Sequence, residues 1–324
     1  MANSIAVRRI ISIFVIAVCL LGIPSGQAFA AEPPAQQEEP PVIKRVYHSY
    51  TAGMKSYKKS GKAYNLKKLL PKKIRKRYVV AQGAATDGKY VYQAFERHNS
   101  HYCVILKYNA KTFKRVKISK PIKIYHANDM TYNPKTKRLY SINCDGKPKG
   151  ITIIHPKTLK IAGRKNIKAP KKFKSFASIA YTKTRNQYLV RVAVLGRLLV
   201  LDAKFKPVGV VTLSKGLGSV PQTVECDDEH IYIPIYRSKK RNEIFVYDWE
   251  GKYQYKITLN KKFEIENFFK VGSAYRVTMY KAMWIQKGYK RETYSYRISL
   301  KKDNYEDIEV VDEADETSEE TETK

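Results

Sequence analysis

The chain is poor in cysteine, which excludes a disulfide-rich fold. Of its four cysteines in 324 residues, Cys19 lies in an N-terminal apolar run. The other three, Cys103, Cys144 and Cys226, form an odd and widely spaced set, and no CxxC spacing indicates a metal site. We expect three buried thiols that pack as small apolar side chains, with one disulfide and one free thiol as the alternative.

Acidic residues are scarce outside the C-terminal end. The chain has 62 Lys and Arg against 29 Asp and Glu, a net charge of +33. Without Arg8, Arg9 and residues 303–324, which hold eleven of the acids, residues 31–302 keep 59 basic and 18 acidic residues, a net +41. Such a charge attracts polyanions. A lysine-rich surface that only keeps the protein soluble is the alternative.

Several catalytic motifs are also missing. The sequence has no G-x-S-x-G turn, no H-E-x-x-H and no phosphate-binding loop. These absences argue against the hydrolases, zinc proteases and nucleotide enzymes that carry those motifs. We therefore expect a binding protein more than an enzyme, with no cofactor and no bound metal.

The N-terminus has the three parts of a secretory signal. Arg8 and Arg9 precede an apolar run over residues 10–23, and Ala28-Phe29-Ala30 is a cleavage site of the A-x-A type. The apolar run is short for a membrane span, which needs about 20 residues. We expect residues 1–30 to be a cleaved signal peptide, no transmembrane span after cleavage, and a secreted or extracellular protein, including one associated with the cell wall.

Five internal repeats dominate the rest of the chain. Each has a short strand, a turn and a Tyr-rich strand, followed by a third and a fourth β-rich run. The tyrosines of the second strands recur after 48, 48, 44 and 43 residues: Tyr92, Tyr140, Tyr188, Tyr232 and Tyr275.

A four-stranded unit that recurs every 40–50 residues is typical of a β-propeller blade. The sequence predicts an all-β fold, most simply five four-stranded blades over residues 76–302, with six blades or a β-sandwich as alternatives. Residues 31–75 are then a spacer and a basic N-terminal segment, and residues 303–324 are a disordered acidic tail. Within residues 42–80 a degenerate sixth blade, a closing strand or a short basic helix are all open; the helix would carry Leu66, Leu69, Leu70 and Ile74.

The repeat resembles that of bacterial secreted propeller-repeat proteins, of the kind found in quinoprotein-dehydrogenase-like and NHL-type folds. The strand–Asp/Asn–Gly or Pro–Lys–Tyr unit over residues 81–298 carries this resemblance. A weaker likeness, to helveticin-like bacteriocins, rests on residues 88–92 and on His126-Ala127. The resemblance implies a propeller and leaves function open, because that group contains enzymes, scaffolds and binding proteins.

Inner strands line the axis of a propeller, so we expect them at residues 82–86, 127–131, 177–181, 222–226 and 265–269. Alignment of the repeats places polar residues in two rings at one end of the axis, as a small-ligand site requires. The candidate ligand-binding residues are Gln82, His126, Asn128, Asp129, Ser178, Gln222 and Glu266. If the protein is an enzyme, the candidate catalytic residues are Asp129, Glu225 and Glu266.

A structural role competes with this interpretation. His126 would then cap a loop, and Asp129 would bond backbone amides of a neighbouring blade to hold the ring closed. A second candidate surface is the expected loop at residues 279–291, where Tyr280, Trp284 and Tyr289 alternate with basic residues. Such a mixture suits a sugar or an anionic polymer, or it is a solvated loop.

The sequence thus predicts a secreted or cell-envelope binding or scaffold propeller. Its expected partner is an anionic cell-wall polymer, a glycan or a protein, and not nucleic acid. The alternative is a secreted propeller hydrolase that cleaves glycosides or lactones with inner-strand carboxylates.

Overall fold

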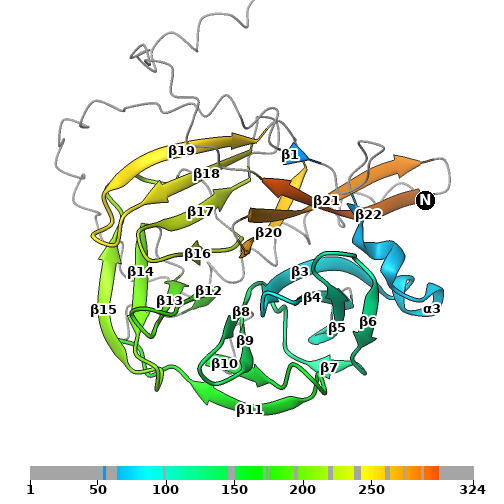
Figure 1. Cartoon of the computed structure of the whole chain (residues 1–324), viewed down its shortest axis with the longest axis horizontal. Coiled ribbons are helices and arrows are strands. Elements are labelled where there is room, and N and C mark those ends of the chain that lie inside the picture. Colours follow the sequence, from blue (N-terminus) through cyan, green and yellow to red (C-terminus); the bar gives the residue numbers. More distant parts are fainter. Residues whose placement is uncertain are drawn as a thin grey trace, which may run out of the picture.

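The computed structural model contains five antiparallel sheets arranged in a ring (Figure 1). It describes residues 54–55, 64–97, 100–144, 150–170, 173, 175–192, 196–217, 222–236, 242–259, 263–272, 274–285 and 288–298. Residues 1–53 and 299–324, where the signal, most of the spacer and the acidic tail are expected, lie outside these residues. The prediction of a five-bladed β-propeller is confirmed.

Each blade is a meander of antiparallel strands that runs outward from the axis. Blade 1 contains β3 (Tyr78–Thr86), β4 (Tyr90–Arg97), β5 (Tyr102–Asn109) and β6 (Arg115–Ile118), with β7 (Ile122–Lys123) also on β5. Blade 2 contains β8 (Met130–Asn133), β9 (Arg138–Ile142), β10 (Gly150–Ile154) and β11 (Ile161–Asn166). Blade 3 contains β12 (Phe176–Thr182), β13 (Gln187–Val192), β14 (Arg197–Leu201) and β15 (Pro207–Thr212). Blade 4 contains β16 (Glu225–Cys226), β17 (Ile231–Ile235), β18 (Asn242–Tyr247) and β19 (Tyr253–Leu259).

Blade 5 combines the two ends of the repeat region. Its inner strands are β20 (Glu264–Val271), β21 (Ala274–Ile285) and β22 (Gly288–Ile298), and its outer positions are filled by β1 (Met54–Lys55) and β2 (Tyr64–Asn65), which both pair with β22. Two helical turns follow, η1 (Leu66–Leu69) and α3 (Lys72–Arg75). Within residues 42–80, the described part therefore supplies closing strands and short basic helical turns, and there is no sixth blade.

Two expected boundaries were wrong. β8 begins at Met130 and β16 at Glu225, so residues 127–129 and 222–224 lead into their strands without belonging to them. The loop expected at residues 279–291 is a hairpin, because β21 and β22 stay paired from Tyr275 and Ile298 up to Ile285 and Gly288. The aromatic and polar residues of this segment continue the two strands and do not form the expected irregular loop.

The repeated tyrosines are buried, and their hydroxyl groups link strands within a blade or two neighbouring blades. All five are at most 4% exposed. The Tyr92 hydroxyl donates to Asp87 in the turn of its own blade (2.7 Å), whereas the Tyr188 hydroxyl accepts from Asn133 of the preceding blade (2.8 Å). The aromatic rings also pack in the cores between neighbouring blades. The recurring tyrosine therefore stabilises both the individual blade and the packing of neighbouring blades.

The turns between third and fourth strands insert an apolar residue between blades. Phe113, Leu159 and Phe205 have positive φ angles of 56°, 61° and 64°, yet each is at most 7% exposed. In blade 4 the equivalent turn ends on Gly251 (φ 86°), where a Cβ would lie 2.0 Å from the carbonyl oxygen of Thr212. Close contact with blade 3 thus requires glycine there.

The described cysteines form no disulfide; Cys103 and Cys226 are buried and Cys144 is partly buried. Among the described residues, no helix is long and apolar enough to cross a membrane.

Candidate functional site

Asp129 lies at the axis and joins the blades. Its side chain is 1% exposed, and its two carboxylate oxygens accept five hydrogen bonds, four of them from blades 3, 4 and 5. The donors are the backbone N–H groups of Met130 (2.9 Å), Ile179 (3.1 Å) and Val224 (3.2 Å), the Thr223 hydroxyl (2.9 Å) and the Asn267 amide (3.0 Å).

This environment has opposing effects on the charge of Asp129. Burial is the largest effect and raises the pKa of its carboxyl to about 7, although the hydrogen bonds from Thr223, Val224, Ile179 and Met130 favour the charged form. Both carboxylate oxygens of Asp129 are occupied by protein donors. Asp129 therefore holds the ring of blades closed, which is the structural alternative to ligand binding.

Neighbouring backbone contacts complete this closure. The Asn128 amide donates to the carbonyl oxygens of Ala177 (2.8 Å) and Gln222 (2.5 Å), and the Gly83 N–H donates to that of Ala127 (2.8 Å). A Cβ on Gly83 would lie 2.5 Å from the backbone of Asp129. Blade 1 therefore approaches the axis so closely that only glycine fits.

A second group of polar residues gathers where the inner strands begin. The Nδ1 of His126 lies 3.0 Å from an oxygen of Glu96, near the end of β4. The amide of Gln222 donates to Glu264, the first residue of β20 (3.1 Å). Glu266 follows two residues later and is 4% exposed. We call these residues the acidic mouth: Glu96, His126, Gln222, Glu264 and Glu266.

Carboxylates of the acidic mouth influence one another. Burial, followed by the charges of Glu264 and Glu96, raises the pKa of Glu266 well above its usual range. Burial also raises the pKa of Glu264, against the hydrogen bond from Gln222 and the charge of His126. The same carboxylates help to raise the pKa values of Tyr236, after β17, and of Tyr280 in β21, although burial is the larger cause for both.

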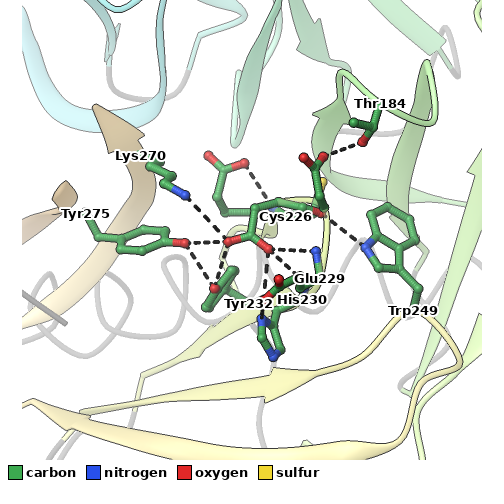
Figure 2. Close-up of polar contacts among 11 residues, drawn as sticks. Thr184, Cys226, Glu229, His230, Tyr232, Trp249, Lys270 and Tyr275 are labelled. Atoms are coloured by element: carbon green, nitrogen blue, oxygen red, sulfur yellow. Dashed lines mark hydrogen bonds and ion pairs between the residues drawn. The ribbon is translucent and has the colours of Figure 1, made fainter. Parts of the chain in front are cut away.

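Glu225 is the first residue of β16, and Asp227 follows this strand in the turn to β17. Burial raises the pKa of Glu225 to about 8, and the charges of Asp129 and Asp227 add to this effect. The Asp227 carboxylate is approached by Lys270 (3.7 Å), Tyr275 (2.7 Å) and Tyr232 (2.9 Å). Figure 2 shows how these three side chains converge. Backbone N–H groups of Glu229 and His230 bond the other oxygen of Asp227.

Burial, the largest effect on the Asp227 carboxyl, would raise its pKa. The hydrogen bonds from Tyr275, the His230 N–H and Tyr232 outweigh it and hold the pKa below its usual range. Asp87 makes part of this arrangement in blade 1, where it accepts from the N–H of Tyr90 and from the hydroxyl of Tyr92. Because the arrangement recurs, we assign it to blade structure.

The structure thus separates the candidate residues. His126, Gln222 and Glu266 lie in the acidic mouth, while Asn128 and Asp129 tie blades together. Of the candidate catalytic carboxylates, Glu225 accepts a hydrogen bond from the Cys226 N–H, and burial together with the charge of Asp129 raises its pKa. For Glu266, burial and the charges of Glu264 and Glu96 raise the pKa. For Gln82 the carbonyl oxygen accepts from the Gln93 amide, and the Ser178 hydroxyl is buried without a hydrogen bond to any described residue.

Sequence reasoning missed Glu96 and Glu264 as members of this group. Glu264 could have been found from its position two residues before Glu266 in the same strand. Glu96 is one of only five acids in residues 64–212, and that rarity was the available signal. Among the described residues, no three His, Cys, Asp or Glu side chains are grouped closely enough to hold a metal ion.

Comparisons with known proteins add little to this picture. No family model matches the sequence, and no curated protein is similar to it in sequence. Among solved structures, hydrazine synthase from Kuenenia stuttgartiensis is similar over 66% of this chain and 62% of its own, with 11% identity and a TM-score of 0.38. The Cps50 (Swd1) β-propeller domain of Myceliophteria thermophila is similar over 67% and 86%, with 9% identity and a TM-score of 0.39.

Proposed function

We propose that this β-propeller is a binding module of the cell envelope or medium that engages an anionic surface polymer through blades 1–3. The supporting observation is the distribution of charge. Residues 64–212 contain 35 Lys and Arg but five Asp and Glu, whereas residues 213–298 contain 16 and ten. A surface of this kind attracts polyanions over a distance set by the salt concentration.

The four described acids of blades 1–3 are engaged elsewhere and do not neutralise this surface. Asp129 is at the axis, Glu96 pairs with His126, and Asp87 and Asp202 bond their own turns. The Lys–carboxylate ion pairs within the described part of the chain, Lys256–Glu243 and Lys270–Asp227, both belong to blades 4 and 5.

Blade 1 carries the densest part of this surface. The helical turns η1 and α3 pack against it through buried Leu66 and Leu70, and Arg115 of β6 donates to the carbonyl oxygen of Leu69 (3.0 Å). Basic side chains therefore continue from the helical turns onto the outer strand. We call the following exposed residues the basic ridge: Lys68, Lys72, Lys73, Lys111, Lys114 and Lys117.

Charge reversal in the basic ridge tests the proposal. Lys114 and Lys252 are exposed and occupy matched positions, directly before the outer strands of blades 1 and 4. We expect Lys114→Glu to weaken binding to isolated cell walls about threefold to tenfold at low salt, because Lys114 lies in the most positive part of the surface. Lys252→Glu should change binding little, because the surface of blade 4 is less positive. Equal losses in both variants would contradict binding through blades 1–3.

Salt and the acidic tail provide the second arm of this test. Wall binding by the full-length protein should weaken steadily as salt rises, because screening shortens the reach of every lysine. Deletion of residues 303–324, which removes eleven acids and Lys324, should strengthen binding at low salt. Binding that ignores both changes would mean that a specific pocket, and not the net charge, holds the polymer.

Export is a separate part of the proposal. It rests on the three-part signal of residues 1–30. Mass spectrometry of secreted protein should find a mature N-terminus at or near Ala31. An intact N-terminus in the cytoplasmic fraction would contradict it.

A further inference from the structure

Glu266 is a buried side chain whose carboxylate has no partner among the residues that the structure describes. It is 4% exposed and makes no hydrogen bond or ion pair with any residue that the structure describes. Buried charged groups are normally paired, because burial without a partner costs several kcal/mol. An exception of this kind indicates that something other than these residues satisfies the carboxylate.

A β-bulge sets Glu266 apart from the strand pairing of its sheet. Ile265 pairs with Met279 and Asn267 with Thr278, so Glu266 is the extra residue of β20. Equivalent register shifts lie at Ala177 of β12 and at Gln82 and Gly83 of β3, so the bulge belongs to the blade repeat, and it leaves Glu266 without a cross-strand partner. The charges of Glu264 and Glu96 act on the Glu266 carboxyl, so the three carboxylates lie near one another.

The acidic mouth concentrates negative charge in a strongly basic protein. One oxygen of Glu96 contacts His126, and one oxygen of Glu264 accepts from Gln222. No described donor bonds the other oxygen of either carboxylate. The facing groups from the remaining elements are Tyr236, beyond β17, Tyr280 of β21, and Arg291 of β22, which donates to the Tyr280 hydroxyl.

These acceptors suit an organic cation better than a metal ion. The carboxylates do not converge on one point, since no three potential ligands among the described residues are close enough to share a metal. An ammonium group offers up to three donors on a longer molecule and can therefore reach separate carboxylates. The neighbouring tyrosines add hydroxyl acceptors and aromatic surface.

We propose that the acidic mouth binds an organic ammonium group, with Glu266 as its principal counter-ion and Glu96 and Glu264 as secondary acceptors. This site is distinct from the basic ridge and does not depend on polymer binding.

The test uses 1,4-diaminobutane as the probe and 1,4-butanediol as its uncharged analogue. Isothermal titration calorimetry of the mature full-length chain at moderate salt and pH 8 should show binding of the diamine and not of the diol. Glu266→Gln should weaken diamine binding about tenfold or more, since it removes the charge at constant volume. Glu243→Gln, which changes a carboxylate of blade 4 that pairs with Lys256, should leave it unchanged.

Thermal unfolding separates binding from folding. The raised pKa of Glu266 means that the unfolded chain ionises before the folded one, so this residue destabilises the protein increasingly as pH rises above about 4.5. Glu266→Gln should therefore unfold at the same or a higher temperature than the wild type at pH 8 and at an equal one at pH 4. Diamine binding should strengthen from pH 5 to 8 as the carboxylates ionise.

Three outcomes would overturn the proposal: no diamine binding by the wild type at pH 8, equal binding of the diol, or unchanged binding in a folded Glu266→Gln variant.

Discussion

Asp129→Ala is expected to remove most of the folding free energy of the propeller. The substitution leaves five donors from four blades without an acceptor at the axis. Each buried donor left unsatisfied costs about 1–3 kcal/mol, so the loss is expected to exceed about 5 kcal/mol. That figure is comparable with the total stability of an ordinary domain, about 5–15 kcal/mol. Urea unfolding followed by circular dichroism measures the change.

Asp202→Ala is the matched control. Asp202 also accepts backbone N–H bonds, from Lys204 and Lys206, but it does so in an exposed turn of its own blade. Its loss is expected to cost about 1 kcal/mol, the value of a turn or cap. If Asp129→Ala unfolds at the same urea concentration as the wild type, Asp129 does not join the blades. An intermediate loss in Asp129→Asn would separate the role of charge from that of shape.

Removal of the closing strands is expected to have an effect of similar size. A mature chain that begins at Pro71 lacks β1 and β2, so the outer edge of β22 loses its partners in blade 5. It also lacks Leu66 and Leu70, which are 0% and 2% exposed in a cluster with Phe269 of β20. Burial of each leucine contributes about 1.5–3 kcal/mol, and ring closure is lost as well. We expect no cooperative thermal transition for this chain.

A shorter deletion provides the comparison. A chain that begins at Met54 keeps every described contact with β22 and should melt cooperatively near the wild-type temperature. Leu66→Asp in the full-length chain should reproduce most of the damage by placing a charge in an apolar cluster. If the chain that begins at Pro71 melts like the wild type, blade 5 closes the ring without N-terminal strands.

Local patterns allowed much of the fold to be predicted. The five recurring tyrosines and the short turns with Asp, Asn or Gly follow from the two-residue period of strands and from turn chemistry. These features depend on neighbours in the chain. The hairpin of β21 and β22 was missed because a sequence that mixes aromatic and basic residues without a regular two-residue alternation resembles a loop.

Other features were decided by tertiary structure. Asp129 bonds residues 50, 94, 95 and 138 positions away, Glu96 meets His126, and Tyr64 lies beside Ser295. Repeat alignment placed Gln82, Gln222 and Glu266 among the polar residues expected at one end of the axis, but it could not show which side chains find partners. The sequence by itself determined blades, because hydrogen bonding within each blade is local. Ring closure and the acidic mouth depend on contacts between blades, whose geometry exists only once the ring has formed.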